Sequence, residues 1–298
     1  MLHSSGFSHP PNGYTGPMEK AIPSIQYVRK LAEEGNSGAQ LLLGYRLKTG
    51  KDVDLDLEAA AQWFRKSADQ GNACAQYLLG SVYENGEGVA KDDASSYLWY
   101  LCSAKQDNQD AQLRLGQKFL HGLGVIQNRK EGLKWLLKAV YAGYDEAQLY
   151  LGIAYFNGHG VETDYARAGI LFKLAATQGN TNAQGFLGWM CLKGLGTQQD
   201  KNKAIRWFLR SAEQNNSTAQ IGLGISFMND DSGSFPDLIS SYYWFRLAKI
   251  NGGRNSDTWL DYLTECMSKS QIEQAEQRVN DWLAEQSEES EESEESES

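Results

Sequence analysis

The chain has 298 residues and a formal net charge of −10, with 28 Lys and Arg against 38 Asp and Glu. Seven of the acids are Glu residues after position 286, so the rest of the chain is close to neutral. Such a balance argues against binding to nucleic-acid backbones or anionic membrane surfaces, which requires clustered positive charge. No stretch approaches the ~18 consecutive apolar residues of a membrane-spanning helix, so we expect no membrane insertion.

The first 36 residues divide into two segments. Residues 1–17 are too polar and too broken to pack, so we expect them to be disordered. They also lack the cationic start and the apolar segment of a secretory signal. Residues 18–36 predict an N-terminal capping helix, because Tyr27 and Ala32 are in phase with helices further along the chain. The four Cys form no CxxC pair, which favours reduced thiols in a cytoplasmic protein.

Residues 37–252 form a tandem repeat. The dipeptide Ala-Gln recurs every 36 residues, and Leu-Gly follows four residues after each Ala in all six copies. The repeated glutamines are Gln40, Gln76, Gln112, Gln148, Gln184 and Gln220. Six copies in constant register indicate a stack of similar units. Such a stack can exceed the usual size of a single-core domain, because each unit contacts only its neighbours.

Each unit predicts two helices. In the first helix, Ala, Leu and a larger residue recur at offsets 0, 4 and 8 from the Ala of Ala-Gln, as in Ala75, Leu79 and Tyr83. This spacing puts them on one helical face. Paired glycines such as Gly86 and Gly88 then end the helix, and an Asp or Asn begins the second one. The second helix usually carries an aromatic residue at offset 24. The expected fold is therefore an all-α solenoid of about six helix-turn-helix repeats.

Two segments follow the repeats. Residues 253–286 predict C-terminal capping helices, since an apolar stripe continues past Trp259 and Ser270-x-x-Glu273 is a capping box. Residues 287–298 are a run of Ser and Glu that we expect to be disordered. The ordinary interpretation of such a tail is a solubilising segment. The alternative is electrostatic capture of a basic partner, or competition for cationic sites in the chain's own groove.

The repeat unit Ala-Gln-x-x-Leu-Gly-x-x-Tyr-x-x-Gly-x-Gly-Val-x-x-Asp, followed by Trp and Ala with Gln-Gly, resembles Sel1-like repeats. These are a subgroup of the tetratricopeptide-like helical repeats. The resemblance covers roughly residues 22–285, and the match is close to ideal at 75–88. It implies a right-handed α-α superhelix whose first helices line the concave side. It also implies an adaptor that assembles other proteins, although such a fold hosts many partners and does not select one.

The recurring glutamines allow two interpretations. The first is a structural ladder, in which each amide bonds to the backbone of the neighbouring unit because buried polar groups must be paired. The second is a row of amides that binds a ligand. The ladder is the favoured hypothesis.

Motifs of catalysis and metal binding are missing from the sequence. There is no HExxH, GxSxG or Walker sequence, and no Ser-x-x-Lys of the kind that hydrolyses β-lactams. His121 and His159 occupy equivalent turns of adjacent units, but no third donor is patterned beside them. Exposed turn histidines are therefore favoured over a zinc site. We expect no catalytic residue, no metal and no cofactor.

A partner is expected to bind at positions that differ between copies, because the constant positions build the array. By the resemblance, offsets 2, 6, 9 and 10 of the first helices face the concave groove. Copies four to six are mostly apolar there, which favours an extended peptide or an amphipathic helix as the ligand. The alternative is that superhelical curvature buries these residues. The candidate partner-binding residues are Tyr45, Tyr77, Asn85, Leu149, Ile153, Phe156, Asn157, Trp189, Leu192, Lys193, Ile225 and Met228.

The sequence therefore predicts a non-enzymatic, cytoplasmic scaffold or adaptor that holds a peptide or helix of a partner protein. Trp189 and Phe156 are the preferred anchors, since aromatic side chains dominate interface hot spots. The runner-up is an immunity or inhibitor protein that neutralises a bacterial toxin or enzyme. Hydrolysis of a small amide ranks last, because it requires an activated nucleophile.

Overall fold

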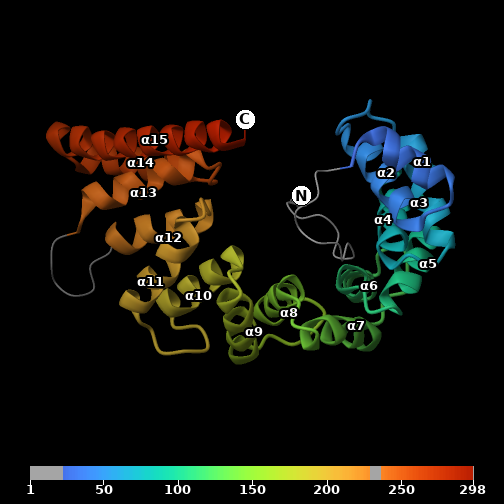
Figure 1. Ribbon diagram of the computed structural model, residues 1–298. Helices are drawn as coiled ribbons and strands as arrows, with labels where there is room; N and C mark the ends of the chain where they lie inside the picture. The colour runs from blue at the N-terminus through green and yellow to red at the C-terminus, as the bar shows by residue number, and fades with distance from the viewer. Residues whose placement is uncertain (1–22, 229–235, 298) are drawn as a thin grey trace. The chain divides into compact units, whose positions relative to one another are not determined.

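The computed structural model describes residues 23–228 and 236–297, and in these ranges the chain is helical with no β-strand. The predicted disordered segment 1–17 lies outside the described residues. The helices, in chain order in Figure 1, are α1 (Ile25–Glu33), α2 (Ser37–Thr49), α3 (Leu57–Asp69), α4 (Ala73–Asn85), α5 (Asp93–Ala104), α6 (Gln109–His121), α7 (Arg129–Tyr141), α8 (Asp145–Asn157), α9 (Tyr165–Thr177), α10 (Thr181–Lys193), α11 (Lys201–Ala212), α12 (Ser217–Met228), α13 (Leu238–Ile250), α14 (Ser256–Cys266) and α15 (Lys269–Glu297).

The chain divides into two compact units, one ending at Ala147 and the other beginning at Gln148. In the first unit, the first helix of each repeat packs against its second helix, as α2 does on α3 and α4 on α5. The second unit repeats this arrangement with α10 on α11 and α12 on α13. The predicted all-α solenoid of helix-turn-helix repeats is confirmed.

Side-chain caps fix where the helices begin. Asn36, Asn72, Asn108 and Asn180 each accept a hydrogen bond of 2.8 to 3.0 Å from the backbone N–H of the following repeat's conserved Ala. Such a bond satisfies one of the donors that the first turn of a helix leaves unpaired. An Asn at the same repeat position therefore begins each of these first helices.

A row of small residues lets the two helices of each repeat approach closely. A Cβ atom at the Gly of any Leu-Gly pair would lie 2.4 to 2.8 Å from a side chain of the second helix. The six pairs are Gly44 with Phe64, Gly80 with Tyr100, Gly116 with Leu136, Gly152 with Phe172, Gly188 with Phe208 and Gly224 with Phe245. All six partner side chains are fully buried. The core residue of each repeat is therefore this large side chain. The usually aromatic residue at offset 24 precedes it in the sequence.

The repeated glutamines are buried and hydrogen-bonded in the same way along both units. Each side-chain amide donates to the carbonyl eight residues earlier, at the end of the preceding helix, with distances of 3.0 to 3.4 Å for Gln40, Gln76, Gln112, Gln184 and Gln220. Their side-chain oxygens accept in turn from the end of the following helix, as Gln40 does from Gln70 at 2.7 Å and Gln184 from Gln214 at 3.3 Å. We infer that this ladder ties successive helices together.

The third repeat lacks one rung of the ladder. Position 142, which corresponds to Gln70 and Gln106, is Ala, and the buried side-chain oxygen of Gln112 has no hydrogen-bond partner. A buried acceptor without a partner costs about 1–3 kcal/mol. The third repeat is therefore expected to be the weaker part of the first unit.

Replacing Ala142 by Gln is expected to stabilise the first unit by about 1 kcal/mol, because the new amide would reach the free oxygen of Gln112. Urea denaturation, with hydrogen exchange resolving α6 and α7, measures the change. Ala142→Leu is the control, since it adds bulk without a donor. Equal stabilisation by both variants would show that packing, and not the rung, is responsible.

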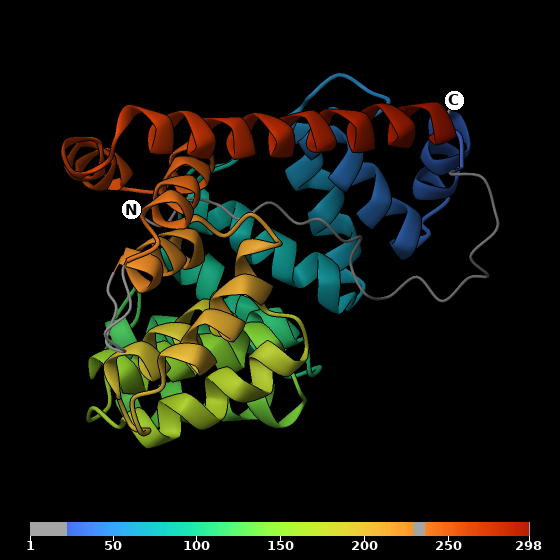
Figure 2. The same cartoon turned by 90° about the vertical axis from the view of Figure 1, so that its left-hand side faces the viewer.

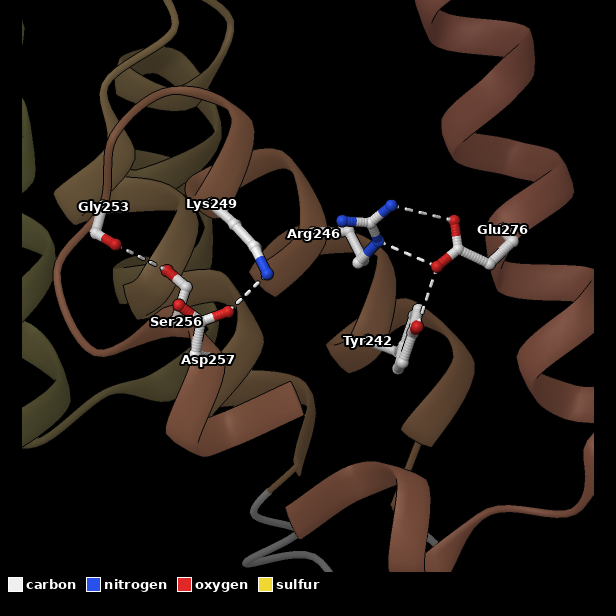
Figure 3. A network of polar contacts seen from close by, with 7 residues as sticks. All are labelled: Tyr242, Arg246, Lys249, Gly253, Ser256, Asp257 and Glu276. Carbon is white, nitrogen blue, oxygen red and sulfur yellow. Dashed lines mark hydrogen bonds and ion pairs between the residues drawn. The ribbon is translucent and has the colours of Figure 1, made fainter. Parts of the chain in front are cut away.

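A polar clamp holds the last helix against the repeats (Figure 3). Glu276 of α15 accepts hydrogen bonds from the Tyr242 hydroxyl at 2.8 Å and from Arg246 Nε at 2.8 Å, both on α13. Arg246 Nη2 donates a further hydrogen bond, at 3.3 Å, to the other carboxylate oxygen of Glu276. Lys249 forms a further ion pair with Asp257 of α14. This clamp fixes the direction in which α15 leaves the array.

The clamp is expected to loosen in acid. Desolvation raises the pKa of Glu276, but the hydrogen bonds from Arg246 and Tyr242 outweigh it and hold the net pKa below the ordinary value. The stabilisation is therefore present above the unfolded-state pKa and lost as the pH falls through the lower, folded one. Protection factors of α15 amides should drop below about pH 4. Glu276→Gln should lower them already at pH 7, whereas the exposed Glu273→Gln should not.

The end of the chain differs from the sequence prediction. Residues 287–298 were expected to be disordered, but α15 continues as one helix to Glu297 (Figure 2). Glu is a good helix former, and extending an existing helix requires no new nucleus. The packed first half of α15 therefore supports helix in the acidic run.

Candidate interaction surfaces

An apolar row runs across the first helices of the second unit. Offset 6 carries Ile153 on α8, Trp189 on α10 and Ile225 on α12, all half-buried. The Phe156 and Phe186 rings, 5.7 Å apart, join α8 to α10, and α10 packs against α12. The first helices therefore form one continuous face, which we call the first-helix face.

The two preferred anchors, Trp189 and Phe156, are also part of the core. Trp189 meets Phe208 edge to face, with ring centroids 5.3 Å apart. Phe156 contacts Tyr165 at 5.3 Å and Phe172 at 6.2 Å. Both side chains therefore support the fold while part of each stays accessible.

The candidate partner-binding residues separate into three classes of exposure. Tyr77, Leu149 and Leu192 are 6 to 9% exposed and are held within the array, so they contribute no contact surface. Asn85, Asn157 and Lys193, at the ends of first helices, are exposed. The half-buried members are Tyr45, Ile153, Phe156, Trp189, Ile225 and Met228. Close packing of neighbouring helices explains why part of the set is covered.

The first unit has a charged cluster where the second unit is apolar. Lys118 Nζ of α6 lies 2.8 Å from Glu84 Oε1 of α4, and the Lys118 side chain is only 2% exposed. The hydroxyl of Tyr100 donates to Glu84 Oε2 at 2.8 Å. The corresponding offsets elsewhere are mostly apolar, as with Met190 and Leu192. The two units therefore differ in the contacts between their first helices.

Burial and charge oppose each other at this cluster. Desolvation raises the pKa of Glu84, but the hydrogen bond and positive charge of Lys118, with the hydrogen bond from Tyr100, hold the net pKa below the ordinary value. Burial, followed by the nearby Glu84 charge, raises the pKa of Tyr100. Glu84 therefore stays ionised and Tyr100 stays protonated at neutral pH. This arrangement suits a fixed structural network rather than proton transfer.

The sequence prediction missed several residues of these faces. Phe186, at offset 3, stacks on Phe172 with ring centroids 4.7 Å apart. Lys118 and Arg46, at offset 7, are buried cations where other copies carry Val82 or Met190. The available signal was a charge at an offset that is otherwise mostly apolar.

The described residues show no arrangement typical of a metal site or a membrane span. Within them, no three His, Cys, Asp or Glu side chains gather in a group that could hold a metal ion. No helix in the described ranges is long and apolar enough to cross a membrane. The four cysteines are free thiols, and burial raises the pKa of Cys74 and Cys191. Those two are consequently poor nucleophiles at neutral pH.

The sequence model of the Sel1 repeat matches the chain six times, at residues 37–72, 75–108, 109–144, 145–180, 181–216 and 217–252. Together these matches cover more than half of the chain. No curated protein matches the sequence.

Solved structures with the same repeat are similar to this chain. A Sel1 repeat protein from Oxalobacter formigenes is 29% identical with a TM-score of 0.67, covering 76% of this chain and 99% of its own. A protective antigen of uropathogenic Escherichia coli strains, described as displaying an SLR fold, is 28% identical with a TM-score of 0.51, covering 87% of this chain and 63% of its own. An immunity protein from Pseudomonas aeruginosa is 16% identical with a TM-score of 0.46, covering 79% and 84%, and supports no argument about function.

Proposed function

The chain belongs to the Sel1 repeat family, whose members are generally protein-interaction scaffolds and typically not enzymes, and from this premise we propose that it binds a peptide or helix of a partner protein on the first-helix face of its second unit. The half-buried row of Ile153, Trp189 and Ile225 supports the proposal. The repeat does not require apolar residues at this offset, because the second and third copies carry Ser81 and Gln117 there.

The chemistry of the face indicates what it would bind. An apolar row with one large aromatic residue suits the apolar side of an amphipathic helix or an extended peptide. Exposed Asn157 and Lys193, at the ends of α8 and α10, would supply polar contacts to the partner's backbone. We propose a cytoplasmic adaptor on this basis, a compartment with which four free thiols are consistent.

The test substitutes residues of the row by those that other copies carry at the same offset. Trp189→Gln with Ile225→Ser is expected to abolish capture of a partner from lysate of the source cells, identified by mass spectrometry. Leu98→Gln, an exposed apolar position on α5, is the matched control and should retain capture.

Thermal unfolding separates lost binding from lost fold, because Trp189 also contacts Phe208. A partner lost only in the row variant, with a melting temperature near that of the wild type, supports the proposal. A partner retained by the row variant contradicts it. If the captured protein is a toxin or an enzyme that the chain inhibits, the inhibitor role replaces the adaptor.

A further inference from the structure

A second surface lies on the second helices of the fourth and fifth repeats, apart from the first-helix face. Trp207 of α11 packs against a core cluster that includes Ala168 and Phe172 of α9. In the first unit the equivalent second helices α3 and α5 are in contact, since Arg65 lies over the Trp99 ring at 5.6 Å, and we infer the same neighbourhood for α9 and α11. Both helices expose the same three repeat positions, spaced i, i+3 and i+7 along one stripe. We call these residues the α9–α11 outer face: Arg167, Ile170 and Leu174 on α9, and Lys203, Arg206 and Arg210 on α11.

The α9 side of this face is apolar and open. Ile170 is 63% exposed and Leu174 is 46% exposed, on consecutive turns of the helix. Ile170 is the most exposed large apolar side chain of the second unit among the described residues. Arg167 borders this pair and lies over the Tyr155 ring at 5.5 Å.

The α11 side of this face is cationic. Residues 201–212 contain four Lys and Arg and no acid. Arg210 stacks on Trp207 at 5.0 Å. In the part of the chain that the structure describes, no carboxylate is within ion-pair distance of Lys203, Arg206 or Arg210.

The same unit carries a segment of opposite character. Residues 283–297 at the end of α15 contain eight Glu and no cation, and they are helical throughout. Leu283, at the start of this segment, is 39% exposed. At ~1.5 Å per residue, the segment is about 22 Å long, which spans the two helical turns of the cationic row.

We propose that the α9–α11 outer face of one copy binds the acidic end of α15, residues 283–297, of a second copy. Within one copy the Glu276 clamp holds α15 along α13, two helices beyond α11, so the contact is assigned to another molecule. In this contact the glutamates pair with Lys203, Arg206 and Arg210, and Leu283 covers Ile170 and Leu174. A contact between two different surfaces is heterologous, so the array can extend head to tail.

Analytical ultracentrifugation of the full chain tests the proposal. The sedimentation coefficient is expected to rise over about two decades of concentration at low salt. It should return to the monomer value at high salt, because the screening length falls from ~30 Å at 0.01 M to ~3 Å at 1 M ionic strength. A chain that stays monomeric throughout at low salt overturns the proposal.

Two full-length variants locate the contact. The face variant is Lys203→Glu with Arg206→Glu and Arg210→Glu, and the tail variant carries Gln in place of the seven Glu after position 286. Each alone is expected to be monomeric at low salt. A control variant, Lys30→Glu with Lys51→Glu and Lys105→Glu, changes the net charge as much as the face variant does and should still associate.

Mixing the two variants keeps the test decisive even if one of them is perturbed. The tail variant retains an intact outer face and the face variant retains an intact tail, so an equimolar mixture is expected to form a heterodimer. Association of either variant alone, or no association in the mixture while the wild type associates, overturns the proposal. If the wild type stays monomeric but an acidic peptide of another protein binds the face, the occupant assigned here is wrong.

Discussion

Gly188→Ala is expected to destabilise the second unit by about 3 kcal/mol or more, whereas Gly185→Ala, three residues earlier in α10, is expected to stabilise it. Both glycines are buried within the helix. At position 188 a Cβ atom would lie 2.4 Å from two ring carbons of Phe208. Phe208 is fully buried and Gly222 of α12 also lies against its ring, which limits how far the ring can move.

The Gly185 variant controls for helix propensity. Its Cβ would have Ser211 Oγ as nearest neighbour at 3.6 Å, which is an ordinary contact. Removing a helical glycine without steric cost gains up to ~1 kcal/mol. The two variants thus share the same chemical change and differ only in the neighbour that the new methyl group meets.

Urea denaturation of the full chain, with hydrogen exchange to separate the two units, measures both effects. The expected pattern is a lower midpoint for Gly188→Ala and a higher one for Gly185→Ala, with changes confined to the second unit. A Gly188 variant as stable as the wild type would falsify the close approach of α10 and α11. The Leu-Gly pair would then be a feature of sequence without a packing role.

The repeat pattern predicted the fold because every copy reports the same geometry. The Gly of the Leu-Gly pair is constant since in every copy it faces a large buried side chain of the next helix. The Trp at offset 24 is the bulkiest side chain of most copies, yet Phe208 and its equivalents, which follow this position in the sequence, occupy the core. Side-chain size alone does not show which of two adjacent residues faces inward.

The candidate surface was less predictable because exposure depends on how closely neighbouring helices pack. Leu149 and Ile153 lie one helical turn apart on α8, but the first is buried and the second is half-buried. A single repeat carries no information about that difference. The outer face of α9 and α11 was not among the predicted surfaces, because its residues lie on second helices and the repeat pattern places the concave groove on the first helices.

Lys118→Met is expected to destabilise the first unit by about 3 kcal/mol at pH 7, because it leaves the Glu84 carboxylate partly buried without its closest cation. Glu84 would keep the hydrogen bond from Tyr100, which prevents a larger loss. The control is Lys134→Met on α7, whose exposed ion pair with Glu131 is worth less than ~1 kcal/mol.

The pH dependence gives this prediction its sharpest test. In the wild type the pKa of Glu84 is lowered in the folded state, so its stabilisation is present above the unfolded-state pKa and lost as the pH falls through the folded value. Without Lys118, only the hydrogen bond from Tyr100 and the charge of Arg114 oppose desolvation, so the folded pKa of Glu84 rises toward the unfolded one. The variant should therefore lose less stability than the wild type as this carboxyl is protonated.

The difference between the two proteins should therefore shrink as the pH falls from 7 to about 3.5, below the ordinary pKa of a Glu side chain. Urea midpoints at both pH values measure this difference. The contributions of the other carboxylates to the pH dependence cancel, because both proteins share them. Glu84→Gln added to Lys118→Met should recover part of the loss at pH 7, since an uncharged acceptor remains for Tyr100. A cost of Lys118→Met that is independent of pH would mean that the lysine acts by packing its side chain and not through its charge.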